Sequence, residues 1–257
     1  MILNEPPQTP YDVRFQLGSI PVRIHPLFWV LVVVLGLMGG EPDGMRLLLW
    51  VGTVFVSILI HELGHIIAMR AFGESGRIVL HSFGGLAISD GASAWGRGRS
   101  PKAQIIISLA GPFAGFLFGA MFLIGFLFAG GIVELKTGLP GILNITHLET
   151  PPGASDHISI LFLMIWFVNF YWGLLNLLPI YPLDGGQIAR ELFQMREPHR
   201  GIINSLWLSV FCSAAIAVYC LTTTNHYLAF FFAYFAFSGY MNIQQLRGSG
   251  FGRGSRW

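Results

Sequence analysis

The sequence predicts an all-α polytopic membrane protein with about six transmembrane helices and a short β-hairpin between the second and third of them. Charged residues make up only 11% of the 257 residues, against roughly 25% in ordinary soluble domains. Mean hydropathy is +0.62, and the apolar residues gather in blocks of bilayer-spanning length. The lipid bilayer is therefore the expected surrounding, and no nucleic-acid partner is expected.

Apolar segments divide the chain into three regions. They run over residues 27–38, 47–69, 103–133, 158–178, 206–221 and 227–241. We expect 1–26 to be a cytoplasmic N-terminal segment, 27–241 a six-span membrane domain and 242–257 a cytoplasmic Gly/Arg-rich tail. The N-terminal segment has no apolar core before a small-residue cleavage site, so it does not resemble a removable signal peptide.

The distribution of positive charge predicts the orientation. If all the segments cross, both termini share one side, and only Arg46 and Lys136 lie opposite. The other basic residues then fall on the side of the termini: Arg14, Arg23, Arg70, Arg77, Arg97, Arg99, Lys102, Arg190, Arg196, Arg200, Arg247, Arg253 and Arg256. Because positive charge marks the cytoplasmic face, we expect both ends inside a bacterial-type cell (inner) membrane.

The second apolar segment contains the sequence His61-Glu62-Leu63-Gly64-His65. On a helix, residues four apart share a face, so both imidazoles can reach one metal ion. Glu62 lies one step round the helix, where it can act as a general base without ligating the ion. The alternative is a pair of hydrogen-bonded interior histidines, which is less favoured because a glutamate lies between them within lipid.

Asp184 is a candidate third ligand. His61 lies roughly 21 Å into a hydrocarbon core of about 30 Å if the second segment starts at the outer boundary. The fourth segment runs the opposite way and stops at Pro179 and Pro182, which brings Asp184 to the same cytoplasmic half. A second interpretation stays open, in which Asp184 to Gln187 form a capping box that starts a helix through Met195.

Charge balance favours a metal in this setting. Zinc with two neutral imidazoles and one aspartate keeps a single positive charge, which an ionised Glu62 would cancel. A cluster close to neutral is what a low-dielectric site tolerates.

The segment Arg77 to Ile88 predicts a short β-hairpin around Gly84-Gly85, because it alternates apolar residues about a glycine turn. The stretch from Tyr11 to Ile24 is a candidate to pair with it. An exposed strand edge here could bind an unwound substrate, with Gly84 and Gly85 lining the active site. The alternative, a simple cytoplasmic cap, has equal weight.

Glycine repeats every four residues in the third segment, at Gly111, Gly115 and Gly119. Such a strip predicts close packing, and we expect it to lie beside the metal-bearing helix. His25 and His81 could also approach a metal, but we interpret both as structural histidines.

Taken together, these motifs resemble the site-2 proteases, intramembrane zinc metalloproteases of peptidase family M50. The resemblance covers about Ile20 to Gln187. It rests on the His-Glu-His sequence and on these further motifs: Pro21-Val22-Arg23-Ile24-His25-Pro26, Phe83-Gly84-Gly85, Ala110-Gly111-Pro112, Asn176-Leu177-Leu178-Pro179 and Leu183-Asp184-Gly185. One departure is that family members often carry an Asn where this chain has Phe113-Ala114-Gly115.

The resemblance implies roles for individual residues. His61, His65 and Asp184 would hold one Zn²⁺ per chain. Glu62 would activate water, and Asn176 would line the active site. From the residues alone, Asn176 could instead hydrogen-bond a neighbouring span, because Asn169 lies seven residues earlier on the same face.

The expected function is hydrolysis of peptide bonds in or near transmembrane segments of membrane-anchored substrates. The resemblance implies regulated intramembrane proteolysis of membrane-anchored regulators or of signal-peptide remnants. A zinc transporter or metal sensor using the same ligands is the main alternative, although it would favour polar groups spread along several spans. A catalytically inactive membrane chaperone is a third. The sequence assigns no oligomeric state.

Overall fold

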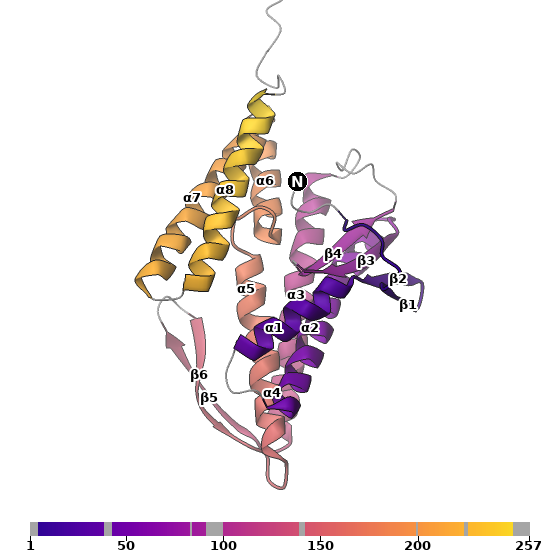
Figure 1. The fold of residues 1–257 in the computed structure, drawn as a ribbon, viewed down its shortest axis with the longest axis vertical. Helices are drawn as coiled ribbons and strands as arrows, with labels where there is room; N and C mark the ends of the chain where they lie inside the picture. Colours follow the sequence, from indigo (N-terminus) through magenta and orange to yellow (C-terminus); the bar gives the residue numbers. More distant parts are fainter. Residues whose placement is uncertain are drawn as a thin grey trace, which may run out of the picture. The chain divides into compact units, whose positions relative to one another are not determined.

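The computed structural model describes residues 5–38, 43–82, 84–90, 100–138, 142–198, 200–223 and 226–248. Its elements in chain order (Figure 1) are β1 (Val13–Leu17), β2 (Ile20–Ile24), α1 (Pro26–Met38), α2 (Gly44–Ala71), β3 (Gly76–His81), β4 (Gly84–Ser89), α3 (Pro101–Phe128), β5 (Ile132–Gly138), β6 (Ile142–Glu149), α4 (Asp156–Trp166), η1 (Phe167–Tyr171), α5 (Trp172–Asn176), α6 (Asp184–Arg196), α7 (Gly201–Thr222) and α8 (His226–Gly248). The chain is mostly helical, as predicted, but it has a four-stranded and a two-stranded sheet where a single short hairpin was expected.

The chain divides into two compact units. The sheet unit contains Pro6–Gly91 and Ala110–Leu174. The C-terminal unit contains the first turns of α3 and the chain from Leu175 onward, with α6, α7 and α8.

Among the described residues, four helical segments are long and apolar enough to cross a membrane. They are Gly44–Ala71, Pro101–Phe128, Asp156–Asn176 and Gly201–Thr222. Helix α1 is apolar but only 13 residues long, and α8 is not among the four. The predicted third segment was too long, because α3 ends at Phe128 and Gly130, at φ +91°, turns the chain into β5. A membrane-type protein is therefore supported, but the count of six spans is not confirmed.

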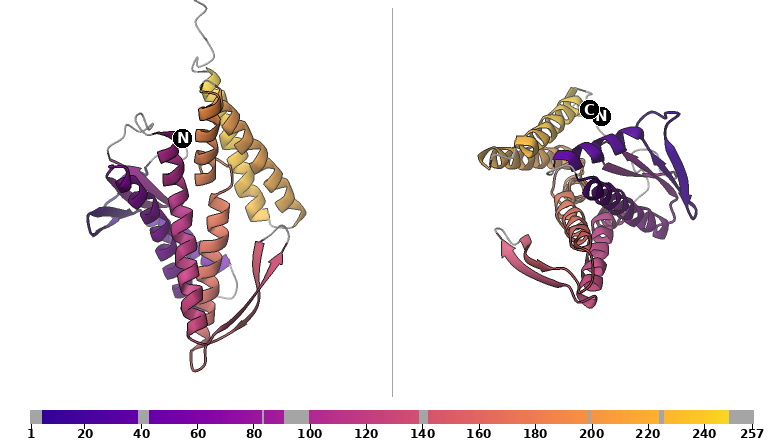
Figure 2. Two further views of the ribbon diagram at one scale, coloured as in Figure 1. Left: turned by 180° about the vertical axis from the view of Figure 1, so that it is seen from behind. Right: turned by 60° about the horizontal axis from the view of Figure 1, so that its bottom comes forward.

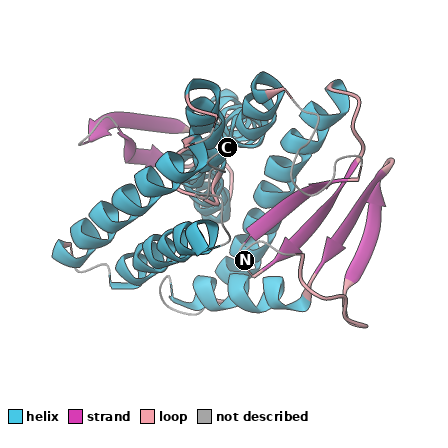
Figure 3. Cartoon of the chain, turned by 90° about the horizontal axis from the view of Figure 1, so that it is seen from above, coloured by secondary structure: helices cyan, strands magenta, loops and turns pink. Residues whose placement is uncertain are grey.

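Strands β1 to β4 form a single sheet in the order β1-β2-β3-β4 (Figure 3). The β3–β4 hairpin confirms the prediction for Arg77 to Ile88, and the parallel pairing of β2 with β3 confirms the partner predicted within Tyr11 to Ile24. Strand β3 is central, with Ile78, Val79 and Leu80 fully buried. Strand β4 is left at the edge of the sheet.

A buried ion pair fixes the N-terminal strands. The Arg23 side chain is 9% exposed and the Asp12 side chain 1%, and Arg23 Nη1 lies 3.0 Å from Asp12 Oδ2. Thr9 donates to Asp12 from its hydroxyl at 2.6 Å and from its backbone N–H at 3.2 Å. These Thr9 bonds, with the Arg23 charge, lower the pKa of Asp12 to about 2.

This lowered pKa predicts acid sensitivity of the fold. The stabilisation from ionised Asp12 is present above its unfolded pKa of roughly 4 and is lost as pH falls through about 2. In detergent, the melting temperature of the wild type should therefore fall between these pH values more steeply than that of Asp12→Asn. The control is Asp43→Asn, because Asp43 is half exposed and pairs with Arg46 at 3.7 Å. The melting temperature of this variant should fall with pH as steeply as that of the wild type. Equal slopes for wild type and Asp12→Asn would contradict the prediction.

Within the sheet unit, the Asn169 side chain hydrogen-bonds from η1 to α2. Its Nδ2 donates to Ser57 Oγ at 2.8 Å and to the Ile165 carbonyl at 2.9 Å. It lies in η1, a π-helical turn where sequence analysis expected regular helix; such turns redirect a side chain by inserting a residue. An interhelical bond of this kind contributes about 0.6 kcal/mol in a membrane. Asn169 thus makes the kind of interhelical hydrogen bond that the sequence analysis considered for Asn176.

The glycine strip on α3 contacts two different partners. Cβ atoms added at Gly115 and Gly119 would lie 3.4 Å from Asn169 Oδ1 and 3.5 Å from Asn169 Cβ. These glycines therefore pack on η1, whereas Gly111 packs on α2. The prediction that the strip lies beside the metal-bearing helix holds for Gly111 only.

A second hairpin, β5–β6, was not predicted. It appears as two long strands after α3 in Figure 2. Its residues Val133, Ile145 and Leu148 pack against a buried aromatic cluster of Phe126, Phe162 and Trp166. Phe126 and Phe162 stack with ring centroids 4.6 Å apart, a geometry that contributes about 0.5–1.5 kcal/mol beyond area burial. The alternating signal in β5 was hidden because the preceding apolar run was assigned to a span.

In the C-terminal unit, α7 and α8 pack side by side (Figure 2). Their contact encloses a core of Ala217, Phe232 and Phe235 around Ile180, which is fully buried. Helix α8 continues to Gly248, so the start of the predicted tail is helical. The rest of that tail, 249–257, lies outside the described residues.

Candidate metal centre

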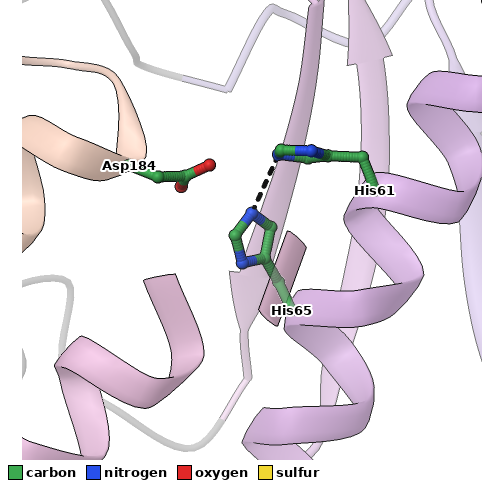
Figure 4. A group of neighbouring side chains, drawn as sticks. All are labelled: His61, His65 and Asp184. Carbon is green, nitrogen blue, oxygen red and sulfur yellow. Dashed lines mark hydrogen bonds between the residues drawn. The ribbon is translucent and has the colours of Figure 1, made fainter. Parts of the chain in front are cut away.

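Helix α2 brings the two predicted histidines together. Asp43 caps its start by accepting a hydrogen bond from the Met45 N–H, and 28 mostly apolar residues follow. His61 Nε2 and His65 Nε2 lie 3.1 Å apart (Figure 4). The shared helix face predicted from the four-residue spacing is confirmed. The 3.1 Å distance suits two ligands of one ion, and it is also that of a hydrogen bond between the rings, the alternative given by the sequence.

The space around these imidazoles depends on glycine. A Cβ added at Gly111 of α3 would overlap His65 Nε2 and lie 2.8 Å from His61 Nε2. At Gly64, between the histidines, a Cβ would overlap the Ala110 carbonyl and lie 2.8 Å from Ala114 Cβ. The role of Gly64 was missed in the sequence, although a glycine inside an apolar helix is a signal of close packing.

Edge strand β4 lies against Glu62. The Glu62 side chain is buried, with the residue 5% exposed. A Cβ added at Gly85 would overlap Glu62 Cγ and lie 2.6 Å from its carboxyl carbon. The strand backbone can approach the carboxylate this closely only because Gly85 has no side chain.

Asp184 is the first residue of α6 and is 8% exposed. The helix predicted to run through Met195 is confirmed, but the capping box is wrong. The N-cap is Leu183, and no side-chain capping hydrogen bond is made there. A Cβ at Gly185 would overlap the carbonyl oxygens of Leu177 and Leu178, so the chain before α6 folds back tightly over its first turn.

The ligand atoms of His61, His65 and Asp184 lie within 4.8 Å of one another (Figure 4). Among the described residues, this is the one group of three or more potential ligands. Two imidazole nitrogens and one carboxylate oxygen suit zinc, and three protein ligands are the usual number in a catalytic site. The space that Gly111 leaves above both Nε2 atoms is consistent with an ion there.

Three further residues considered in the sequence analysis are Asn176, His25 and His81. Asn176 is the last residue of α5 and is 9% exposed, and its role at the active site stays a prediction. His25 Nδ1 accepts the Leu27 N–H at 3.2 Å, so His25 caps α1, in line with its structural interpretation. Burial, then the nearby His25 and Arg23, lowers the pKa of His81, which keeps this imidazole neutral at pH 7.

Comparisons with known proteins show the family to which this chain belongs. The family model for peptidase family M50 matches residues 50–220. Zinc metalloprotease MJ0392 of Methanocaldococcus jannaschii is 29% identical over 190 residues, which cover 72% of this chain and 47% of that protein. Stage IV sporulation protein FB of Bacillus subtilis is 27% identical over 181 residues, covering 70% and 50%. The chain thus spans about half the length of the curated relatives it matches.

The site-2 protease from Methanocaldococcus jannaschii has a similar fold, with a TM-score of 0.54 at 23% identity. The alignment covers 91% of this chain and 95% of that one. Since the family match extends over most of the chain and includes the whole His-Glu-His sequence, this chain belongs to peptidase family M50.

Proposed function

We propose that this chain is an intramembrane zinc endopeptidase that hydrolyses peptide bonds in or near transmembrane segments of membrane-anchored proteins. His61, His65 and Asp184 hold the zinc ion, and Glu62 is the general base. Regulated intramembrane proteolysis is the corresponding process. The zinc metalloproteases among the relatives support this assignment, as does membership of the M50 family.

The observation that carries the proposal is a buried His-Glu-His set within an apolar helix. Two imidazole nitrogens lie 3.1 Å apart inside α2, and polar side chains are costly to place in an apolar helix unless they have a function or a polar partner there. Glu62, 5% exposed, lies next to His61 in the same helix. A nearby cation stabilises a buried carboxylate, and an ion held by the two histidines and Asp184 would supply such a charge beside Glu62.

A zinc ion bound by His61, His65 and Asp184 would supply Lewis acidity toward the scissile carbonyl and toward water, so that attack would be possible at neutral pH. The proton transfer is carried out by a residue of the protein. Glu62 accepts the proton of the attacking water and passes it to the leaving amine. The two histidines take no part in this proton transfer, because their nitrogens would serve as ligands. Burial of the site within α2 and α3 restricts the approach of bulk water.

Strand β4 is proposed to bind substrate, with Gly84 and Gly85 lining the active site. A transmembrane helix must unwind before hydrolysis because its carbonyls are already hydrogen-bonded. An edge strand can pair with the unwound segment through its backbone. The close approach of Gly85 to Glu62 supports this role, since a segment paired with β4 lies next to the general base. Asn176 is proposed to line the same site.

The proposed topology has six membrane crossings, with both termini in the cytoplasm of a bacterial-type cell. The four long apolar helices supply four crossings. The proposal adds α1 and α8 as the first and last. The distribution of arginine and lysine supports this arrangement.

The test is cleavage of tagged single-span membrane proteins by the purified chain, read together with its zinc content. We expect cleavage to stop when a chelator removes zinc and to return when zinc is restored. Asp184→Ala should lower both zinc content and cleavage. A chain that cleaves without bound metal would overturn the proposal. Zinc entry into vesicles that persists in Glu62→Gln would instead favour a transporter.

Gly85→Ala should reduce cleavage about tenfold or more while zinc content stays unchanged. The added methyl displaces the Glu62 carboxylate, and a misplaced general base forfeits part of a contribution of about 10²–10⁴-fold. The control is Ala87→Ser, a similarly small change two residues along β4. Equal activity of the two variants would show that β4 does not constrain Glu62.

A further inference from the structure

A hydrogen bond to a side chain of α7 holds the loop that precedes Asp184. The Tyr181 N–H donates to Ser209 Oγ at 2.9 Å. Ser209 is fully buried, in the middle of α7. This bond joins residues 28 apart in the sequence, both within the C-terminal unit.

Backbone hydrogen bonds carry this attachment on to Asp184. The Leu183 N–H donates to the Ile180 carbonyl at 2.8 Å, and the Gln187 N–H donates to the Leu183 carbonyl at 3.1 Å. Ile180 is itself fully buried in the core formed by α7 and α8. The segment from Ile180 to Asp184 therefore has little freedom to move except together with α7.

The start of α6 fits against the same loop. A Cβ added at Gly186 would lie 2.5 Å from the Ile180 carbonyl oxygen. Gly185 is similarly tight against Leu177 and Leu178. A small movement of the loop at Tyr181 is consequently transmitted to the first turn of α6, which carries Asp184.

We infer that Ser209 is a positioning residue that holds the loop so that Asp184 is presented as a zinc ligand. This inference rests on the proposed function, because it takes Asp184 to be a ligand. The α7–α8 pair then positions the loop of an M50 chain: its core holds Ile180, and the Ser209 hydroxyl holds the backbone one residue later.

The energetic reason lies in the Tyr181 N–H. Without the Ser209 hydroxyl, this donor loses its acceptor next to an apolar core, which is unfavourable unless the loop shifts. A shift of the loop displaces the Asp184 carboxylate relative to its position in the folded unit. Loss of a partner behind a ligand typically weakens metal affinity by about 10–100-fold.

The test is zinc affinity, measured on full-length protein in detergent by competition with a chromophoric chelator. Ser209→Ala should weaken zinc binding by about tenfold or more. The matched control is Ser213→Ala, one turn along α7. Ser213 is equally buried, but its hydroxyl donates to the Ser209 carbonyl within the helix at 2.7 Å. We expect wild-type affinity for this control, and equal losses in the two variants would overturn the inference.

Two further variants separate positioning from stability. Ser209→Thr keeps the acceptor oxygen and should bind zinc more tightly than Ser209→Ala; tighter binding by Ser209→Ala would count against a role for the hydroxyl. In an Asp184→Asn background, Ser209→Ala should have little additional effect, because a residue that acts through Asp184 is not additive with it. Additive losses would refute positioning. If Asp184→Ala leaves zinc affinity unchanged, the ligand assignment itself fails, which is a different result from additivity.

Discussion

The Glu62→Gln variant is expected to bind zinc like the wild type and to lose cleavage by a factor of about 10³ or more. Glutamine has nearly the same shape as glutamate and fits the same space between α2 and β4, but it cannot accept a proton. Since Glu62 is not one of the three grouped ligands, its substitution should leave the affinity for the ion nearly unchanged. Only the proton-transfer step is removed.

Elemental analysis and cleavage of a tagged single-span substrate check both parts of this prediction. Glu74→Gln is a suitable control, because Glu74 is a carboxylate of the same unit that accepts a hydrogen bond from Ser89 at 2.6 Å. The control should keep both zinc and activity. Proteolysis that survives in Glu62→Gln would remove Glu62 from the mechanism, and loss of zinc in this variant would make it a ligand.

Gly111→Ala is expected to weaken zinc binding by at least about 100-fold and to abolish cleavage with it. The added methyl would occupy the space directly beside His65 Nε2 and 2.8 Å from His61 Nε2. Both imidazoles would have to rotate away, and the two nitrogens could no longer converge on one ion. Because the substitution displaces both histidines, the loss of zinc affinity should exceed that caused by substituting a residue that supports only one ligand.

Gly119→Ala is the matched control for this prediction. It makes the same change two helical turns further along α3, where the added Cβ meets Asn169 Cβ at an ordinary 3.5 Å. We expect wild-type zinc content for this variant, together with an unchanged melting temperature. If the Gly111→Ala variant kept its zinc, the prediction would be wrong, because the two imidazoles would not lie against Gly111 as the packing of α2 on α3 has them.

Local patterns could be interpreted from the sequence because their physical causes are local. The four-residue spacing of His61 and His65 is a property of any α-helix. The hairpin around Gly84-Gly85 followed from strand alternation and a glycine turn. The end of the fourth segment near Pro179 followed from the missing N–H of proline. The β5–β6 hairpin could not be separated from the preceding apolar run, because a short apolar stretch fits strand and helix alike.

What the sequence by itself determined is the chemistry: which side chains could ligate a metal, which carboxylate could act as a base, and that the motif lies in an apolar helix. Tertiary structure decided what those side chains have around them. Gly111 beside the imidazoles, Gly85 against Glu62 and Ser209 behind the loop of Asp184 are contacts between residues at least 23 positions apart. Spacing along the chain carries information over a few helical turns only, whereas such contacts depend on how separate elements pack.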